Sequence, residues 1–225
     1  MHHNLKEILD YKKNIINQDK YKLMLAAPSI YLTLLHDKKY DLLSEYVSGK
    51  KYKDNTGAIS AESLKSIDVK GSIIAHKEDP SQFVEKISKA KELLSNKMKS
   101  YIIISETKNE YDYQYTIDKL LGQIRAILSP IPPKYYKNIT FIYMPSWLNN
   151  KDDAIDIDYL KLVINKLKIE TENDYGKPFK FIYGGNLDKT NAIKYLNEDV
   201  LDGILLEESI FDVNNLNEIL KESKK

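Results

Sequence analysis

Five side chains that can exchange protons each follow an apolar segment: His76, Glu78, Glu106, Glu207 and Glu208. Imidazole and carboxylate groups are the usual general acids and bases of enzymes. If the apolar segments are parallel strands, their carboxyl ends meet at one mouth, and the five side chains gather there. Such a cluster favours a cation or an amine over a phosphate. The simpler interpretation is a solvated acidic rim.

One further strand end lacks this chemistry. Residues 139–143 read ITFIY, the β-branched and aromatic usage of a strand that is buried on both faces. Pro145 ends this strand because it has no N–H for the ladder, and Met144 therefore lies at the tip. A thioether cannot accept a proton at any useful pH. We interpret Met144 as a core-filling side chain.

Strands and helices alternate along the chain. Apolar runs predict strands at 22–27, 41–47, 71–75, 101–104, 139–143, 179–183 and 203–206. Helical periodicity predicts helices at 4–18, 30–37, 60–67, 81–96, 113–128, 155–169, 189–197 and 213–221. In the helix at 81–96, the expected apolar face includes Phe83 and Val84. This alternation indicates an α/β fold with a parallel sheet in one domain, residues 1–225. Periodicity alone does not separate a barrel from a doubly wound sheet.

Composition excludes several classes of protein. The formal net charge of +1 gives no electrostatic footprint for nucleic acid. No apolar run approaches the ~18–20 residues of a membrane span. Cysteine is absent, which excludes disulfides and thiolate metal sites and fits a cytoplasmic location. Arg125 is the only arginine and glycine occurs eight times, so the usual means of holding a phosphate are scarce.

Five motifs in register resemble the triosephosphate isomerase family. Residues 56–64 (TGAISAESL) are similar to its T-G-E-I-S-A-x-x-L segment, and residues 73–78 (IIAHKE) to its strand ending in G-H-S-E-R. Residues 143–147 (YMPSW) resemble Y-E-P-V-W, and residues 183–186 (YGGN) resemble Y-G-G-S. Residues 202–206 (DGILL) resemble the start of D-G-x-L-V-G-G. The order and spacing agree from about Met1 to Lys221.

The resemblance implies a (β/α)8 barrel, usually a homodimer. It also implies interconversion of dihydroxyacetone phosphate and glyceraldehyde 3-phosphate, a step of glycolysis and gluconeogenesis, without cofactor or metal. This chemistry needs a carboxylate base, polarisation of the substrate oxygens and a water-excluding grip on the phosphate. The loop Ser48–Gly57 matches the family's dimer-forming loop in approximate length, although its lysines also suit an ordinary solvated loop.

By resemblance, His76 stands at the electrophile position and Glu78 matches the acid two residues further on. Met144 stands at the base position, where the family has glutamate. General-base catalysis contributes roughly 10²–10⁴-fold to rate, so this substitution alone predicts a severe loss of activity. Two positions that pair charges in the family are also changed, because Ala58 replaces the glutamate of T-G-E and Asp79 replaces an arginine.

The expected phosphate positions are partly substituted. Gly184 and Gly185 keep the family residues and Asn186 replaces a serine. Glu207 and Glu208 replace the two glycines whose N–H groups meet phosphate. Unit charges about 4 Å apart repel by about 4 kcal/mol at an effective dielectric constant near 20, so these carboxylates reject a phosphate unless they turn away.

The lid of the family is also altered. Residues 148–152 read LNNKD where the family has A-I-G-T-G, and they contain no glycine. A closure onto phosphate like that of the family is therefore not expected.

The first strand of the family, which carries its substrate-contacting lysine in N-x-K-M, has no counterpart after Met1. Two interpretations stay open: a natural upstream strand precedes Met1, which we place first, or the protein lacks this strand. A barrel without it has two unpaired sheet edges.

Three functional hypotheses follow. The leading one is a degenerate family member with weak or no isomerase activity, a pseudoenzyme. The second is an active isomerase that binds triose phosphate and takes its base from Glu106, Glu207 or Glu208. The third is a barrel repurposed to bind a non-phosphate ligand or a protein partner.

Overall fold

A computed structural model of the chain describes residues 4–51, 56–76, 79, 81–107, 112–148 and 154–222. For Glu208, the structure describes the backbone but not the side chain. Glu78, most of the expected lid and the tip of the loop 48–57 therefore lie outside the described residues.

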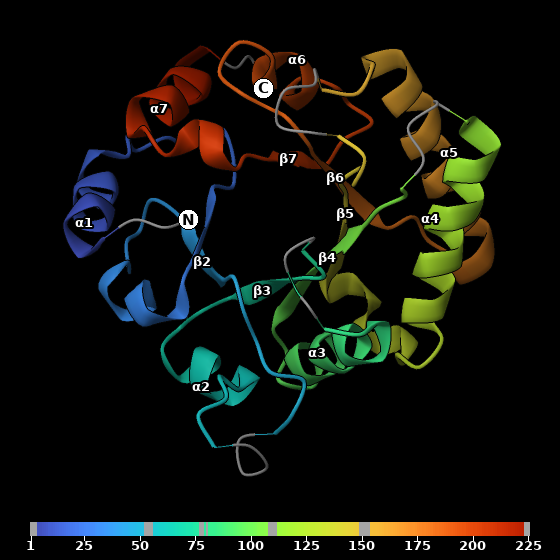
Figure 1. Ribbon diagram of the computed structural model, residues 1–225, viewed down its shortest axis with the longest axis horizontal. Helices are drawn as coiled ribbons and strands as arrows, with labels where there is room; N and C mark the ends of the chain where they lie inside the picture. Colours follow the sequence, from blue (N-terminus) through green and yellow to red (C-terminus); the bar gives the residue numbers. More distant parts are fainter. Residues whose placement is uncertain are drawn as a thin grey trace.

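Within these residues, seven parallel strands form one sheet in chain order and curl into a partial barrel, with the helices outside (Figure 1). They are β1 (Met24–Ala27), β2 (Asp41–Ser44), β3 (Gly71–Ile74), β4 (Lys99–Ile104), β5 (Ile139–Tyr143), β6 (Lys180–Gly184) and β7 (Gly203–Leu205). The order and the shape confirm the α/β barrel class, and the registry places all carboxyl ends at one mouth. The second strand is shorter than expected, because it ends at Ser44.

Seven α-helices cover the outside of the described sheet. They are α1 (Leu5–Asn14), α2 (Ala61–Ser66), α3 (Phe83–Ser95), α4 (Tyr113–Leu128), α5 (Ile157–Tyr175), α6 (Ala192–Leu196) and α7 (Val213–Glu222). Short 3-10 helices are η1 (Ser29–Leu34), η3 (Pro133–Asn138) and η4 (Glu208–Ile210). The expected helix at 30–37 is thus the shorter 3-10 helix η1, and the hydroxyl of its first residue, Ser29, lies 3.2 Å from Ser44 Oγ.

Two apolar clusters hold the fold together. The larger one lies between the sheet and the helices. The smaller one fills the inside of the curled sheet, with the following buried members: Leu43, Tyr101, Ile103, Ile142, Met144 and Ile182. The inside of the barrel is therefore a packed core.

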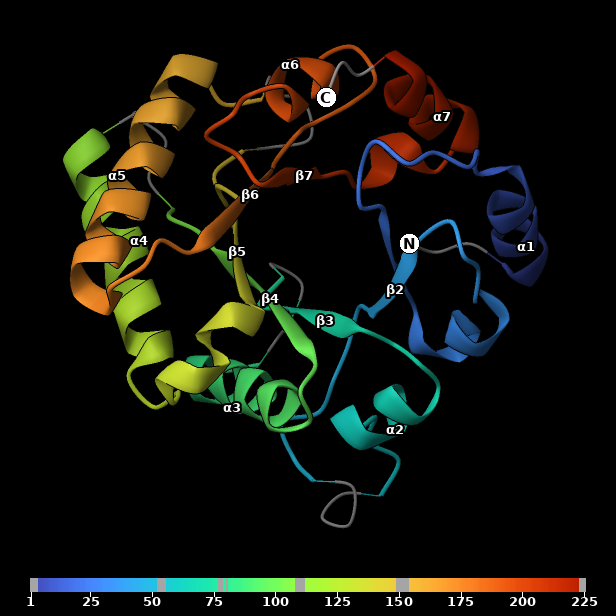
Figure 2. The same cartoon turned by 180° about the vertical axis from the view of Figure 1, so that it is seen from behind.

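The two ends of the sheet are joined by helices. Among the described residues, β1 and β7 each pair with one neighbouring strand only. Asn217 on α7 accepts a hydrogen bond from Ile16 N (3.1 Å) and donates one to Asn14 O (2.8 Å). Figure 2 shows α7 lying against α1 at this place. Contacts between a side chain and the backbone therefore join the two ends of the sheet there.

No helix in the described ranges is long and apolar enough to cross a membrane.

Candidate functional site

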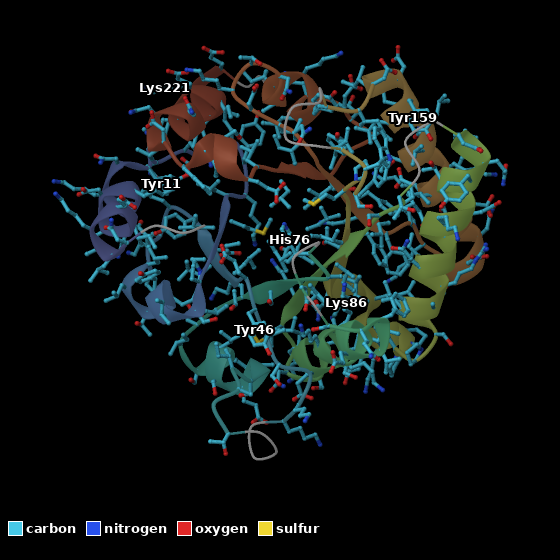
Figure 3. All side chains as sticks on the ribbon, in the orientation of Figure 1. Tyr11, Tyr46, His76, Lys86, Tyr159 and Lys221 are labelled. Carbon is cyan, nitrogen blue, oxygen red and sulfur yellow. The ribbon has the colours of Figure 1, made fainter. Side chains whose placement is uncertain are left out.

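The candidate site lies at the mouth formed by the carboxyl ends of the strands. His76 lies two residues beyond the end of β3, and Figure 3 places it near the centre of the ring of strands. The residue before it, Ala75, has φ +69°, the left-handed region that favours glycine. A strain of about 1–2 kcal/mol is therefore held next to His76.

A carboxylate of the chain itself contacts His76. Glu207, two residues beyond β7, places Oε1 2.9 Å from His76 Nε2. The two side chains are 30% and 36% exposed, so the pair contributes little to stability, at most about 1 kcal/mol. The contact matters because it links the loops after β3 and β7, which are not neighbouring strands in the sheet. The side chain of Glu207 thus reaches across the mouth, and its carboxylate contacts the imidazole at Nε2.

Met144 points into the interior core. It is 5% exposed and packs with the cluster inside the sheet. A Cβ added to Gly184 would lie 3.0 Å from Met144 Cε and 3.2 Å from Leu205 Cβ. Gly184 therefore leaves the space that Met144 fills, which agrees with the interpretation of Met144 as core filling.

Glu106 organises the chain after β5. It is 3% exposed, and its Oε1 accepts hydrogen bonds from Tyr143 Oη and Trp147 Nε1, both at 2.8 Å. Its backbone oxygen accepts one from Ser146 Oγ at 2.7 Å. Oε2 is buried without a hydrogen-bond partner. Burial raises the pKa of Glu106, and the bonds from Trp147 and Tyr143 oppose this shift. Glu106 is thus a buried structural acid and does not face the mouth as a free base.

The chain after the lid is fixed as well. Ile155 N donates to Tyr183 Oη (3.0 Å), and Ile155 O accepts from Tyr195 Oη (2.6 Å). Both flanks of residues 149–153 are therefore tied to the barrel, one through Trp147 and the other through Ile155.

The remaining expected phosphate positions keep a turn. Gly185 has φ +150°, and Asn186 has φ +50°, a conformation that asparagine tolerates better than most residues. Asn186 O also accepts a hydrogen bond from Asn191 Nδ2 at 3.0 Å. The backbone of Glu208 begins η4. Residues 184–186 thus form a turn at the mouth, and Glu207 lies in the loop after the next strand.

One ion pair at the mouth was missed by sequence reasoning. Lys89 Nζ on α3 bonds both carboxylate oxygens of Asp79 (2.9 and 3.1 Å) and Ser81 Oγ (2.7 Å). It also lies 4.9 Å from the centre of the Tyr46 ring. Asp79 N donates to His76 O, which links this pair to the loop that carries His76. The signal that could have revealed this ion pair is Lys89 itself, a charged residue within the buried stripe of α3.

The arrangement can donate or accept a proton at His76 and hold a negative charge at Glu207. It has no carboxylate at the tip of β5, where Met144 is buried. Among the residues that the structure describes, no group of three or more histidine, aspartate or glutamate side chains could hold a metal ion.

Comparison with known proteins identifies relatives along the whole chain. A family model described as triosephosphate isomerase matches residues 1–223. The triosephosphate isomerase of Ureaplasma parvum serovar 3 is 26% identical over 216 residues, covering 93% of this chain and 90% of the relative. That of Wigglesworthia glossinidia brevipalpis is 27% identical over an alignment of 237 positions, covering 98% and 91%. That of Mycoplasmoides gallisepticum is 30% identical over 167 residues, covering 68% and 64%.

Substitution of Met144 tests its burial. Met144→Glu places a carboxylate in an apolar core and is expected to lower the free energy of unfolding by about 2–5 kcal/mol at pH 7. Met144→Leu, which conserves volume, is expected to cost less than about 1.5 kcal/mol. Urea denaturation measures both. Equal stability of the two variants would mean that the side chain reaches solvent.

The buried acid Glu106 predicts a pH dependence. Because burial raises its pKa above the ordinary value of 4.5, the folded protein keeps this proton to higher pH than the unfolded chain. The stability due to this group therefore falls as pH rises from 4.5 through the raised pKa. The Glu106→Gln variant has no titrating group at this position. Its free energy of unfolding, relative to that of the wild type, should therefore increase over that pH window in urea denaturation. A relative stability that decreases as pH rises would contradict the shift.

Proposed function

Since this chain belongs to the triosephosphate isomerase family, we propose that it is a degenerate isomerase with weak or no turnover of triose phosphates. The observation that carries the proposal is the burial of Met144 in the barrel core, because the resemblance of residues 143–147 to Y-E-P-V-W assigns the catalytic base to this position. His76 keeps the electrophile position, with Glu78 as the acid beyond it in the sequence. Polarisation of a carbonyl by His76 alone does not abstract a carbon-bound proton.

The second support is electrostatic. Glu207 lies at an expected phosphate position and contacts His76 at 2.9 Å. A substrate oxygen directed to His76 Nε2 competes with this carboxylate, and a phosphate nearby is repelled by it. The loss of the base and the added negative charge act on different parts of the substrate. Both changes oppose the reaction.

A cytoplasmic location remains a prediction from the sequence.

An active isomerase is the alternative that one observation favours. The carboxylate of Glu207 contacts His76 at the mouth, and a His–Glu pair can transfer protons. In this alternative Glu207 replaces the missing base, whereas Glu106 is held by Tyr143 and Trp147.

A coupled assay of triose phosphate isomerisation separates the two. We expect wild-type turnover well below the ordinary range of about 1–10³ s⁻¹, with little further change in Glu207→Gln. Turnover within that range would contradict the degenerate site. A loss of that turnover in Glu207→Gln, with Glu62→Gln at an exposed position of α2 as the matched control, would assign the base to Glu207.

We also propose a homodimer through the loop Ser48–Gly57. Ser48 N donates to Ile59 O (2.8 Å), which closes the base of this loop. Apolar side chains remain exposed beside it, with Tyr46 at 48% and Val84 at 70%. Gly49 lies against Ser88, one turn beyond Val84 on α3. Exposed apolar residues around one loop suit an interface.

Light scattering on the purified protein is expected to give twice the mass of the chain, and Val84→Asp is expected to give the monomer, because a charge is then buried in the interface. Ile30→Asp on η1, where the native side chain is 76% exposed, is the control and should stay dimeric. A monomeric wild type, or dissociation by both variants alike, would refute this interface.

A further inference from the structure

A small cavity lies behind the mouth, between the sheet and two helices. Its volume is about 90 Å³. Ala75 and Ser105 line it from the ends of β3 and β4, Lys86 from α3, and Gln123 and Ile127 from α4. Figure 3 shows Lys86 on α3, outside the ring that surrounds His76. The cavity is thus separate from the pair formed by His76 and Glu207.

The cavity combines one cation with apolar walls. In the part of the chain that the structure describes, no carboxylate lies within ion-pair distance of Lys86 Nζ, and no hydrogen bond of the Ser105 hydroxyl occurs. Gln123 is already used, because its side chain bonds both the N–H and the C=O of Ser105. Ile102 and Ile127 supply apolar walls. An ammonium and a hydroxyl therefore remain as donors beside apolar surface.

Size and charge define the ligand. A cavity of about 150 Å³ accommodates benzene, so one of this size suits a molecule of about four non-hydrogen atoms. The donors require an anionic oxygen, and the isoleucines require an apolar end. We propose that this cavity binds a small aliphatic carboxylate, of the acetate class, with its carboxylate on Lys86 and Ser105 and its alkyl end against Ile102 and Ile127.

The cavity adjoins the site through the chain. Ala75, with its left-handed backbone, precedes His76, and Ser105 precedes Glu106. A ligand in the cavity thus touches the residues before the imidazole and before the acid that holds Trp147. This inference does not depend on isomerase activity, since neither Lys86 nor Ser105 has a role in the proposed isomerase site.

Titration with acetate and with acetamide, followed by the ¹H–¹⁵N signals of Ala75 and Ser105 at constant ionic strength, tests the proposal. Acetamide has the same size and no charge. We expect saturable shifts with a dissociation constant in the millimolar range for acetate, and binding of acetamide at least about tenfold weaker. No saturation of the acetate shifts up to about 100 mM, or equal binding of both compounds, would overturn the assignment.

Variants locate the site. Lys86→Met removes the ammonium from a half-buried position and is expected to weaken acetate binding by at least about tenfold. Lys91→Met removes an exposed lysine of the same helix and should leave the affinity unchanged. Equal affinity in the wild type and Lys86→Met, or equal weakening by the two substitutions, would show that acetate binds elsewhere or through charge in general.

Discussion

The inside of the curled sheet has to be filled by side chains, because a void there loses packing energy. The strands supply apolar residues that meet along the axis, and Met144 is one of them. Gly184 faces Met144 without a Cβ, so methionine occupies the tip of β5 and the neighbouring strand β6 leaves room for it. A carboxylate at this place would need solvent or a partner. The chemistry of the site is therefore limited by the packing beneath it.

At the mouth, above this core, polar side chains hold one another through hydrogen bonds and ion pairs. Glu106 collects hydrogen bonds from Tyr143, Ser146 and Trp147, and so fixes the chain that leaves β5. Lys89 and Asp79 fix the loop after His76. Glu207 then reaches across the mouth to the imidazole. A packed scaffold thus positions a histidine at the barrel mouth, and the carboxylate of Glu207 contacts its Nε2.

Much of the fold follows from the sequence, because alternating apolar strands and amphipathic helices are local patterns. The seven strands and the core role of Met144 could be predicted in this way. Tertiary contacts determine which face of each helix is buried and which polar side chains pair. Phe83 and Val84 have helical spacing in the apolar face, yet they are exposed because the buried stripe of α3 runs through Lys89, Ala90, Leu93 and Leu94. The contact of Glu207 with His76 joins residues 131 positions apart, which no local pattern reveals. The partner of Asp79 is only ten positions away, but their pairing depends on how the loop after β3 turns back onto α3.

The pairing of His76 with Glu207 can be observed directly in the ¹⁵N signal of His76 Nε2. Addition of glycerol 3-phosphate, a three-carbon phosphate without a reactive carbonyl, measures whether such an anion reaches the imidazole. We predict no saturable change up to about 10 mM, because Glu207 holds the nitrogen and repels the phosphate. A shift that saturates at micromolar concentration would contradict this account and would mean that the mouth is still a phosphate site.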